Sequence, residues 1–208
     1  MTIEDQTRPI SIVMTVHDQA DLLEQNLPAF LTLPYDGQYE VIVVDNMSTD
    51  DTPDLLKRMK AEYPRLYTTF LPSSVIVNPS RKRLALSIGA KAAHHDYIVL
   101  ADIRRTPVNA EWLAGLADGE ASLVYSNRKR NRVTHVVATD LKDLSHIILK
   151  AERRSFKDYW SKWLRKRRGL YDAIGVRREH VFDAIMLYDQ KIRGFRLLGL
   201  RLRVWLGF

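Results

Sequence analysis

Short apolar runs alternate with helical patterns in the first half of the chain. The runs at residues 10–16, 39–45, 67–71 and 97–102 are rich in β-branched residues and mostly apolar, which is typical of strands buried on both faces of a parallel sheet. Apolar positions at helical spacing predict helices at residues 21–31, 53–63, 80–93 and 107–116. The alternation predicts an α/β fold with a doubly wound, mostly parallel sheet, whose ligands bind at the carboxyl ends of the strands.

The second half of the chain is less regular and carries more positive charge. Its pattern predicts a strand at residues 122–126 and helices at 141–154 and 156–168. Segment 192–208 mixes Leu, Val, Trp and Phe with arginines, so it suits the headgroup plane of an anionic bilayer. The alternative is that this segment completes the core and leaves its arginines at the rim.

Charge and composition narrow the choice of partners. The 208 residues have a formal net charge of +7, with 11 Lys/Arg against 17 Asp/Glu in residues 1–120 and 21 against 8 in residues 121–208. The basic second half favours binding to an anionic surface such as phospholipid headgroups. The alternative is that this basic face is only solvated and binds no partner. A nucleic acid partner is not expected, because the acidic half would repel a long polyanion. The absence of cysteine and of a secretory signal favours a cytoplasmic location.

Polar residues follow three of the predicted strands, at the edge where ligands are expected. His17-Asp18 follows the first strand, Asp45-Asn46 the second and Asp102 the fourth. Basic residues at 81–83 stand at the start of a predicted helix. Because positive charge opposes the helix dipole at that end, local propensity does not account for these residues.

Three segments together resemble the nucleotide-sugar-binding half of a family 2 glycosyltransferase of the GT-A fold. They are residues 11–18, 43–52 and 97–102, which occur in the family's order and spacing, and the stretch VVDNMSTDDT at 43–52 is the most specific. The resemblance implies a GT-A nucleotide-sugar-binding domain at residues 1–120. It implies that residues 121–208 are a basic, helix-rich extension on the acceptor or membrane side, packed on the same domain.

The resemblance also implies roles for individual residues around a nucleoside-diphosphate sugar. Thr15, His17 and Asp18 match the loop that meets the nucleobase. Asp45, with Asn46 beside it, matches an aspartate that accepts a hydrogen bond from a base N–H, a role that suits a carboxylate.

The phosphate side of the donor is expected at a helix start. Lys82 and Arg83 match the basic start of the helix that approaches the diphosphate, and an anion there would satisfy both these side chains and the free backbone N–H groups. Asp102 matches a residue that contacts the ribose or a metal.

The metal motif departs from the family pattern. Such enzymes usually carry Asp-x-Asp, whose paired carboxylates hold Mg²⁺ or Mn²⁺, whereas this chain has Asp102-Ile103-Arg104-Arg105. A divalent cation at Asp102 would lie next to a fixed positive charge. Two interpretations follow: Arg104 and Arg105 clamp the diphosphate in place of a metal, or the site has lost catalysis and retains binding.

The residue that removes the acceptor's proton has no clear match. Asp172 is nearest to the expected acceptor-side segment, and Asp183 and Asp189 are further candidates. The sequence therefore favours a glycosyltransferase that moves a sugar to a glycan or lipid-linked acceptor, peripheral on the inner face of the cytoplasmic membrane. The alternative is a catalytically inactive relative that acts as the partner of another transferase.

Overall fold

The computed structural model describes residues 7–71, 81–107, 109–117, 123–129, 132–137, 171–183 and 185–186. For residues 81–83, 123–129, 132–137, 171, 172 and 174 it describes the backbone alone. The helices predicted at 141–154 and 156–168, the predicted membrane segment 192–208 and Asp189 lie outside the described residues.

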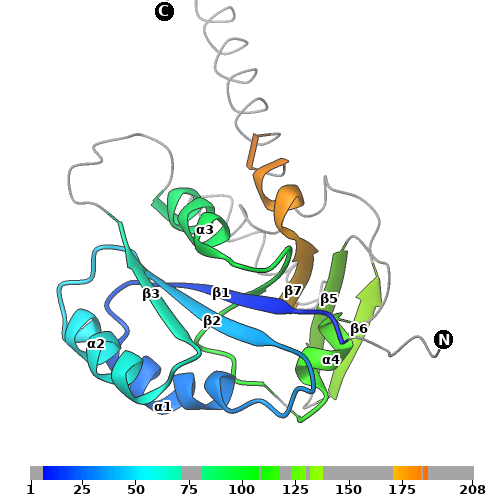
Figure 1. Ribbon diagram of the computed structural model, residues 1–208, viewed down its shortest axis with the longest axis horizontal. Helices are drawn as coiled ribbons and strands as arrows, with labels where there is room; N and C mark the ends of the chain where they lie inside the picture. The colour runs from blue at the N-terminus through cyan, green and yellow to red at the C-terminus, as the bar shows by residue number, and fades with distance from the viewer. Residues whose placement is uncertain are drawn as a thin grey trace, which may run out of the picture.

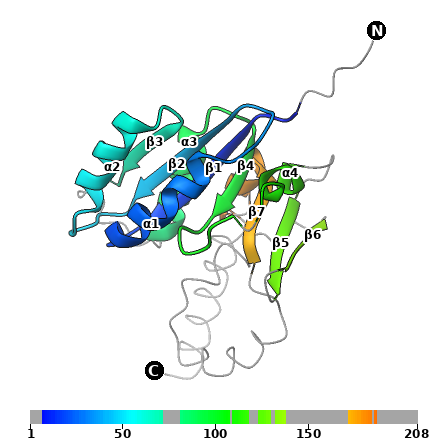
Figure 2. The ribbon, with the colours of Figure 1, turned by 90° about the horizontal axis from the view of Figure 1, so that it is seen from below.

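In the part of the chain that the structure describes, seven strands form one sheet in the order β3-β2-β1-β4-β7-β5-β6 (Figures 1 and 2). Four strands of the first half pair in parallel: β1 (Ile10–Val16), β2 (Tyr39–Asp45), β3 (Leu66–Phe70) and β4 (Tyr97–Ala101). Three strands extend the sheet through antiparallel pairs: β5 (Leu123–Lys129), β6 (Arg132–Val137) and β7 (Tyr171–Arg177).

Five of the seven described strands run in the same direction, in agreement with the predicted mostly parallel sheet, while the pairs beyond β4 are antiparallel. Because β7 is antiparallel to both β4 and β5, β5 runs in the same direction as β1–β4. The sheet continues past residue 120, so the domain boundary expected there would divide one sheet, and that boundary stays a prediction.

Helices cover both faces of this sheet. Helices α1 (Ala20–Leu31) and α2 (Thr52–Glu62) lie on one face and α3 (Arg81–Ala92) on the other (Figures 1 and 2). Helix α4 (Trp112–Ala117) begins later than predicted, because residues 109–111 form a turn in which the Trp112 N–H donates to the Asn109 carbonyl at 3.3 Å. Among the helices that the structure describes, none has the length and apolar character to cross a membrane.

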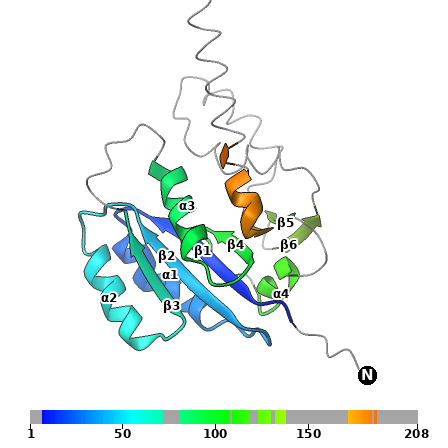
Figure 3. The same cartoon turned by 45° about the horizontal axis from the view of Figure 1, so that its top comes forward.

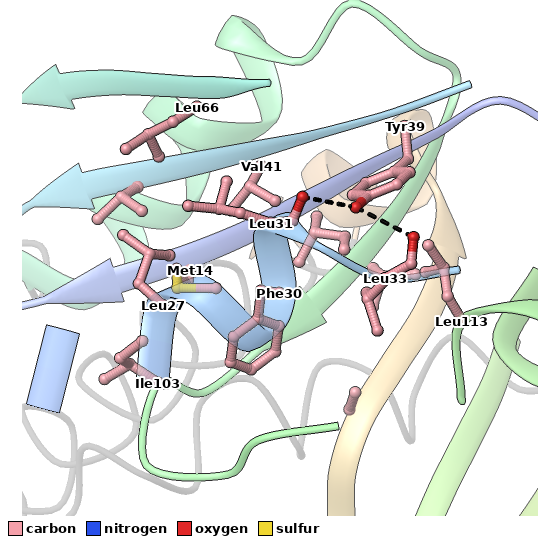
Figure 4. Packing of buried hydrophobic residues seen from close by; sticks show 14 of the residues in the cluster. Met14, Leu27, Phe30, Leu31, Leu33, Tyr39, Val41, Leu66, Ile103 and Leu113 are labelled. Atoms are coloured by element: carbon pink, nitrogen blue, oxygen red, sulfur yellow. Dashed lines mark hydrogen bonds between the residues drawn. The ribbon is translucent and has the colours of Figure 1, made fainter. Parts of the chain in front are cut away.

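Strands β1, β2 and β4 are buried on both sides, so two cores form among the described residues. In β1, Met14 contributes to the core under α1 and α2, while Val13 contributes to the core under α3, as expected from the alternation of side chains along a strand. Figure 4 shows part of the first core, where the Tyr39 hydroxyl donates to the Leu31 and Leu33 carbonyls at 2.9 and 3.3 Å. These bonds satisfy carbonyl groups at the end of α1.

Helix α3 packs closely on β1 and β2 (Figure 3). A Cβ atom at Gly89 would lie 2.5 Å from a methyl group of Val13 and 3.0 Å from one of Val44. The glycine therefore lets the helix backbone approach the sheet, and α3 begins at the edge where β1 and β2 end.

Strand β7 was not predicted from the sequence pattern, which contains Gly175 within the segment. A Cβ atom there would lie 2.6 Å from the Leu116 carbonyl oxygen and 2.6 Å from the Tyr97 hydroxyl. Gly175 therefore marks a close approach between the strand and α4.

Candidate functional site

The parallel pairing of β2, β1 and β4 brings their carboxyl ends to one edge of the sheet. The loops that follow these strands carry His17 and Asp18, then Asp45 and Asn46, and then Asp102. Helix α3 starts at the same edge, so the backbone of Lys82 and Arg83 lies in its first turn there. The structure thus brings together the residues that the sequence predicted for the donor site.

Two loops at this edge hold each other in place. The Asp18 N–H donates to the Ser48 hydroxyl at 2.9 Å, and the Asp18 carboxylate accepts from the Thr49 N–H at 2.7 Å. Asp18 adopts a left-handed conformation with φ 49°. The loop after β1 is therefore fixed against the loop after β2 by hydrogen bonds in both directions.

The carboxylate of Asp50 bridges the starts of two helices. It accepts from the Ala20 N–H, at the start of α1, and from the Thr52 N–H, at the start of α2, both at 3.0 Å. The Thr52 hydroxyl accepts from the Gln19 N–H at 3.2 Å. Gln19, the residue before α1, makes no side-chain capping bond itself, so the second loop caps the first helix.

Hydrogen bonding sets the acidity of the two exposed carboxylates in these loops. Burial opposes ionisation of Asp50, but the hydrogen bonds from Thr52 and Ala20 hold its pKa below the ordinary value of 3.8. The pKa of Asp18 is also lowered. The main cause is the hydrogen bond from the Thr49 N–H, which together with the nearby His17 outweighs the opposing effect of desolvation. Sequence reasoning missed the roles of Ser48, Thr49, Asp50 and Thr52, although it noted the motif that contains them.

Asp45 lies at the end of β2 with only 2% of its surface exposed. Its Oδ1 accepts from the Ser48 N–H at 3.0 Å, and Met47 between them has φ 61°. The Asn46 N–H donates to the Val16 carbonyl at 2.8 Å. Among the described residues, the buried Oδ1 of Asn46 has no hydrogen-bond donor.

Thr15 and Asp45 belong to opposite faces of the sheet. Thr15 pairs with Val44, which lies in the core under α3, whereas Asp45 pairs with Val16, which lies in the core under α1. A ligand can therefore contact both residues only from beyond the strand ends.

Asp102 and Arg104 form an ion pair within one short loop. The Asp102 Oδ1 accepts from Nε and from the backbone N–H of Arg104 at 2.9 and 3.1 Å, and Oδ2 accepts from Nη2 at 2.5 Å. This carboxylate raises the pKa of Arg104 further. The Asn26 side chain donates to the Ile103 carbonyl at 3.0 Å, which ties the loop to α1.

The described side chains at this edge do not fit a divalent cation. A cation on Asp102 would have to displace the Arg104 guanidinium or lie beside it. Within the ranges that the structure describes, no three His, Cys, Asp or Glu residues gather as a metal site would require.

Asp172 lies at the same edge through the pairing of β7. Ala101 pairs with Ala173, so the residues next to them, Asp102 and Asp172, follow at the carboxyl edge. The pairing of β7 with β5 shifts at this point, since Ser126 pairs with Ala173 and Asn127 with Tyr171. Asp172 is thus the extra residue of a β-bulge, a feature that is frequent beside active sites. Asp183 follows β7 in the helical residues 178–183.

A separate groove of about 350 Å³ lies between α1 and α2. Its lining consists of Ala20, Asp21, Glu24, Asp51, Asp54, Leu55 and Arg58. Four carboxylates make this groove unsuitable for a phosphorylated ligand.

The family and structural comparisons agree with this geometry. The sequence model described as Glycosyl transferase family 2 matches residues 11–103, which contain the loops after β1 and β2 and the first two residues of the loop after β4. No curated protein sequence matches the chain.

Solved structures of two glycosyltransferases resemble the fold. A mannosyltransferase from Pyrobaculum calidifontis, in complex with GDP-Man and Mn²⁺, is 26% identical with a TM-score of 0.50, and the match covers 61% of this chain and 37% of that one. Glucosyl-3-phosphoglycerate synthase from Mycobacterium tuberculosis is 22% identical with a TM-score of 0.47, and the match covers 83% and 57%. The chain therefore spans less than two thirds of the length of these proteins.

The family match, the sheet order and the position of the loops lead to one assignment. Residues 11–103 resemble the nucleotide-sugar-binding part of a Glycosyl transferase family 2 domain, and the sheet agrees with the GT-A fold.

Proposed function

We propose that this chain is a glycosyltransferase that moves a sugar from a nucleoside-diphosphate sugar to a hydroxyl group of a glycan or lipid-linked acceptor. The observation that carries the proposal is the joining of the loops after β1 and β2 by Asp18, Ser48 and Asp50 at the carboxyl edge of a family 2 domain. A site held in its binding conformation before the ligand arrives loses less entropy on binding.

The nucleobase end of the donor is assigned to Asp45. Its Oδ1 is engaged by the Ser48 N–H, so Oδ2 is the atom proposed to accept a base N–H. A hydrogen bond to a buried carboxylate is stronger than one between neutral groups. Bases without an N–H at this position would leave the carboxylate unpaired and bind less tightly.

The diphosphate is assigned to the space between the loop at 102–105 and the start of α3. The free N–H groups at a helix start attract anions, and Lys82 and Arg83 occupy the first turn of α3. Arg104 and Arg105 add positive charge from the other side. The leaving diphosphate would thus be stabilised where its negative charge develops.

Asp172 is the proposed general base. The acceptor hydroxyl would lose its proton to the Asp172 carboxylate while its oxygen bonds to the anomeric carbon, and the bond from that carbon to the diphosphate would break. The position of Asp172 in the bulge next to Asp102 supports this role.

Calorimetric titration of the protein with UDP, GDP and CMP tests the proposal. One nucleoside diphosphate should bind, and Asp45→Asn should weaken it by about 10- to 100-fold, because the amide offers an N–H where the base needs an acceptor. Asp54→Asn, which changes an exposed carboxylate on α2, is the matched control and should bind like wild type. Equal affinity of the two variants, or no binding to any nucleotide, would contradict the proposal.

The transfer step needs a second measurement. Release of nucleoside diphosphate from the matching nucleotide sugar should be detectable with wild type and strongly reduced in Asp172→Asn, while binding of the nucleotide should be retained. Nucleotide binding without any release, over a range of acceptors, would support an inactive partner protein instead.

A further inference from the structure

The carboxylate that would hold a metal is already neutralised by its own loop. Both oxygens of Asp102 accept hydrogen bonds from the Arg104 guanidinium, at 2.9 Å from Nε and 2.5 Å from Nη2. The Arg104 backbone N–H adds a third bond to Oδ1. A bidentate pair of this kind fixes the plane of the guanidinium as well as its distance.

The other carboxylates of the edge are committed to backbone N–H groups. Asp18 accepts from Thr49, Asp45 accepts from Ser48, and Asp50 accepts from the starts of α1 and α2. Each of these carboxylates already accepts a backbone hydrogen bond, and among the described residues no three His, Cys, Asp or Glu residues gather to hold a cation at Asp102.

The Arg104 guanidinium has donors that Asp102 does not use. Arginine carries five N–H groups, and the carboxylate engages Nε and Nη2. The side chain is 64% exposed, so Nη1 and the second hydrogen of Nη2 can reach a ligand. These donors remain on a guanidinium whose plane Asp102 already fixes.

We infer that this donor site binds the diphosphate without a divalent cation, and that the ion-paired Arg104 supplies the charge and the hydrogen bonds at that position. The inference rests on the proposed function, since it concerns how the same site holds its donor. Asp102 acts as a positioning residue: it orients the guanidinium, and the loop is held in turn by the bond from Asn26 to the Ile103 carbonyl.

Titration of the matching nucleoside diphosphate in EDTA and in MnCl₂ tests the inference. The dissociation constants should agree within about twofold, and Arg104→Ala should weaken binding in EDTA by about tenfold or more, the loss expected for a charge-assisted bond. Arg58→Ala is the matched control, because Arg58 is similarly exposed (68%) and ion-paired, to Glu24 at 2.9 Å. Binding that requires Mn²⁺, or that survives Arg104→Ala unchanged in EDTA, would overturn the inference.

Mn²⁺ alone provides a test that does not depend on any nucleotide. The electron paramagnetic resonance signal of free Mn²⁺ should be unchanged by wild type, and Arg104→Asp, which removes the guanidinium and adds a carboxylate, should reduce it. Mn²⁺ binding by wild type that disappears in Asp102→Asn would refute the metal-free site. Failure of all nucleotides to bind would instead count against the proposed function, so the two failures are distinguishable.

Discussion

Replacing Asp50 with alanine should destabilise the fold more than its exposed position suggests. The carboxylate accepts hydrogen bonds from the first turns of both α1 and α2. Loss of one helix cap costs about 1 kcal/mol, with a range of about 0.5–2. Two caps give an expected loss of about 2 kcal/mol in the free energy of unfolding, measured by urea denaturation at pH 7 with an unchanged m-value.

A neighbouring carboxylate provides the control for this prediction. Asp54 lies in the first turn of α2 but is paired with Lys57, and its side chain is 83% exposed. Asp54→Ala removes a similar charge without removing a cap, so its cost should stay below about 1 kcal/mol. A loss for Asp50→Ala no larger than that of Asp54→Ala would refute the idea that Asp50 caps two helices.

The pH dependence of the Asp50 effect follows from its lowered pKa. Because the folded-state pKa lies below the ordinary value of 3.8, the carboxylate contributes stability above pH 3.8 and loses it as the pH falls through the folded-state pKa. The difference in stability between wild type and Asp50→Ala should therefore be constant near neutral pH and shrink below pH 3.8. A difference that shrinks already between pH 7 and pH 5 would contradict this assignment.

Three further substitutions test the packing that positions the site. Gly89→Ala should cost about 1–3 kcal/mol in thermal or urea denaturation despite the better helix propensity of alanine, because the new methyl group would overlap Val13; a stabilised variant would contradict the close packing of α3. Trp112→Ala should cost about 3–5 kcal/mol, since the side chain is fully buried against Phe30 at 5.8 Å between ring centroids, and a cost below about 1 kcal/mol would show that α4 contributes little. The buried Glu40 has a lowered pKa, because its hydrogen bonds outweigh desolvation. Glu40→Ala should therefore be less stable than wild type above pH 4.5, and this difference in stability should shrink as the pH falls below that value. A difference in stability that does not change with pH would show that the ionised carboxylate is not its cause.

The parallel half of the sheet was predictable because burial on both faces leaves a strong local signal. Strands β1 and β2 are apolar at nearly every position, and the structure buries every residue of β2. Helix α4 was predicted less well, since the turn closed by Asn109 delays its start. Strand β7 was missed because Gly175 resembles a loop signal, whereas its role is to let Tyr97 and α4 approach the strand.

The candidate site was also predictable only in part, because some of its features lie within short stretches of sequence and others join distant residues. The order of Asp45, Asp102 and Arg104 along the sequence was enough to predict which residues gather at the edge. The bonds from Ala20 to Asp50 and from Asp18 to Ser48 join residues 30 positions apart, so no local pattern contains them. The Asp102–Arg104 pair shows that the departure from Asp-x-Asp has a defined structure, which composition alone does not reveal.

The most direct test of the donor site is a crystal structure of the protein with the nucleoside diphosphate that binds it. The account predicts the base N–H within hydrogen-bond distance of Asp45 and the diphosphate between the loop at 102–105 and the start of α3. A nucleotide bound in the acidic groove between α1 and α2, or at the amino ends of the strands, would contradict the account.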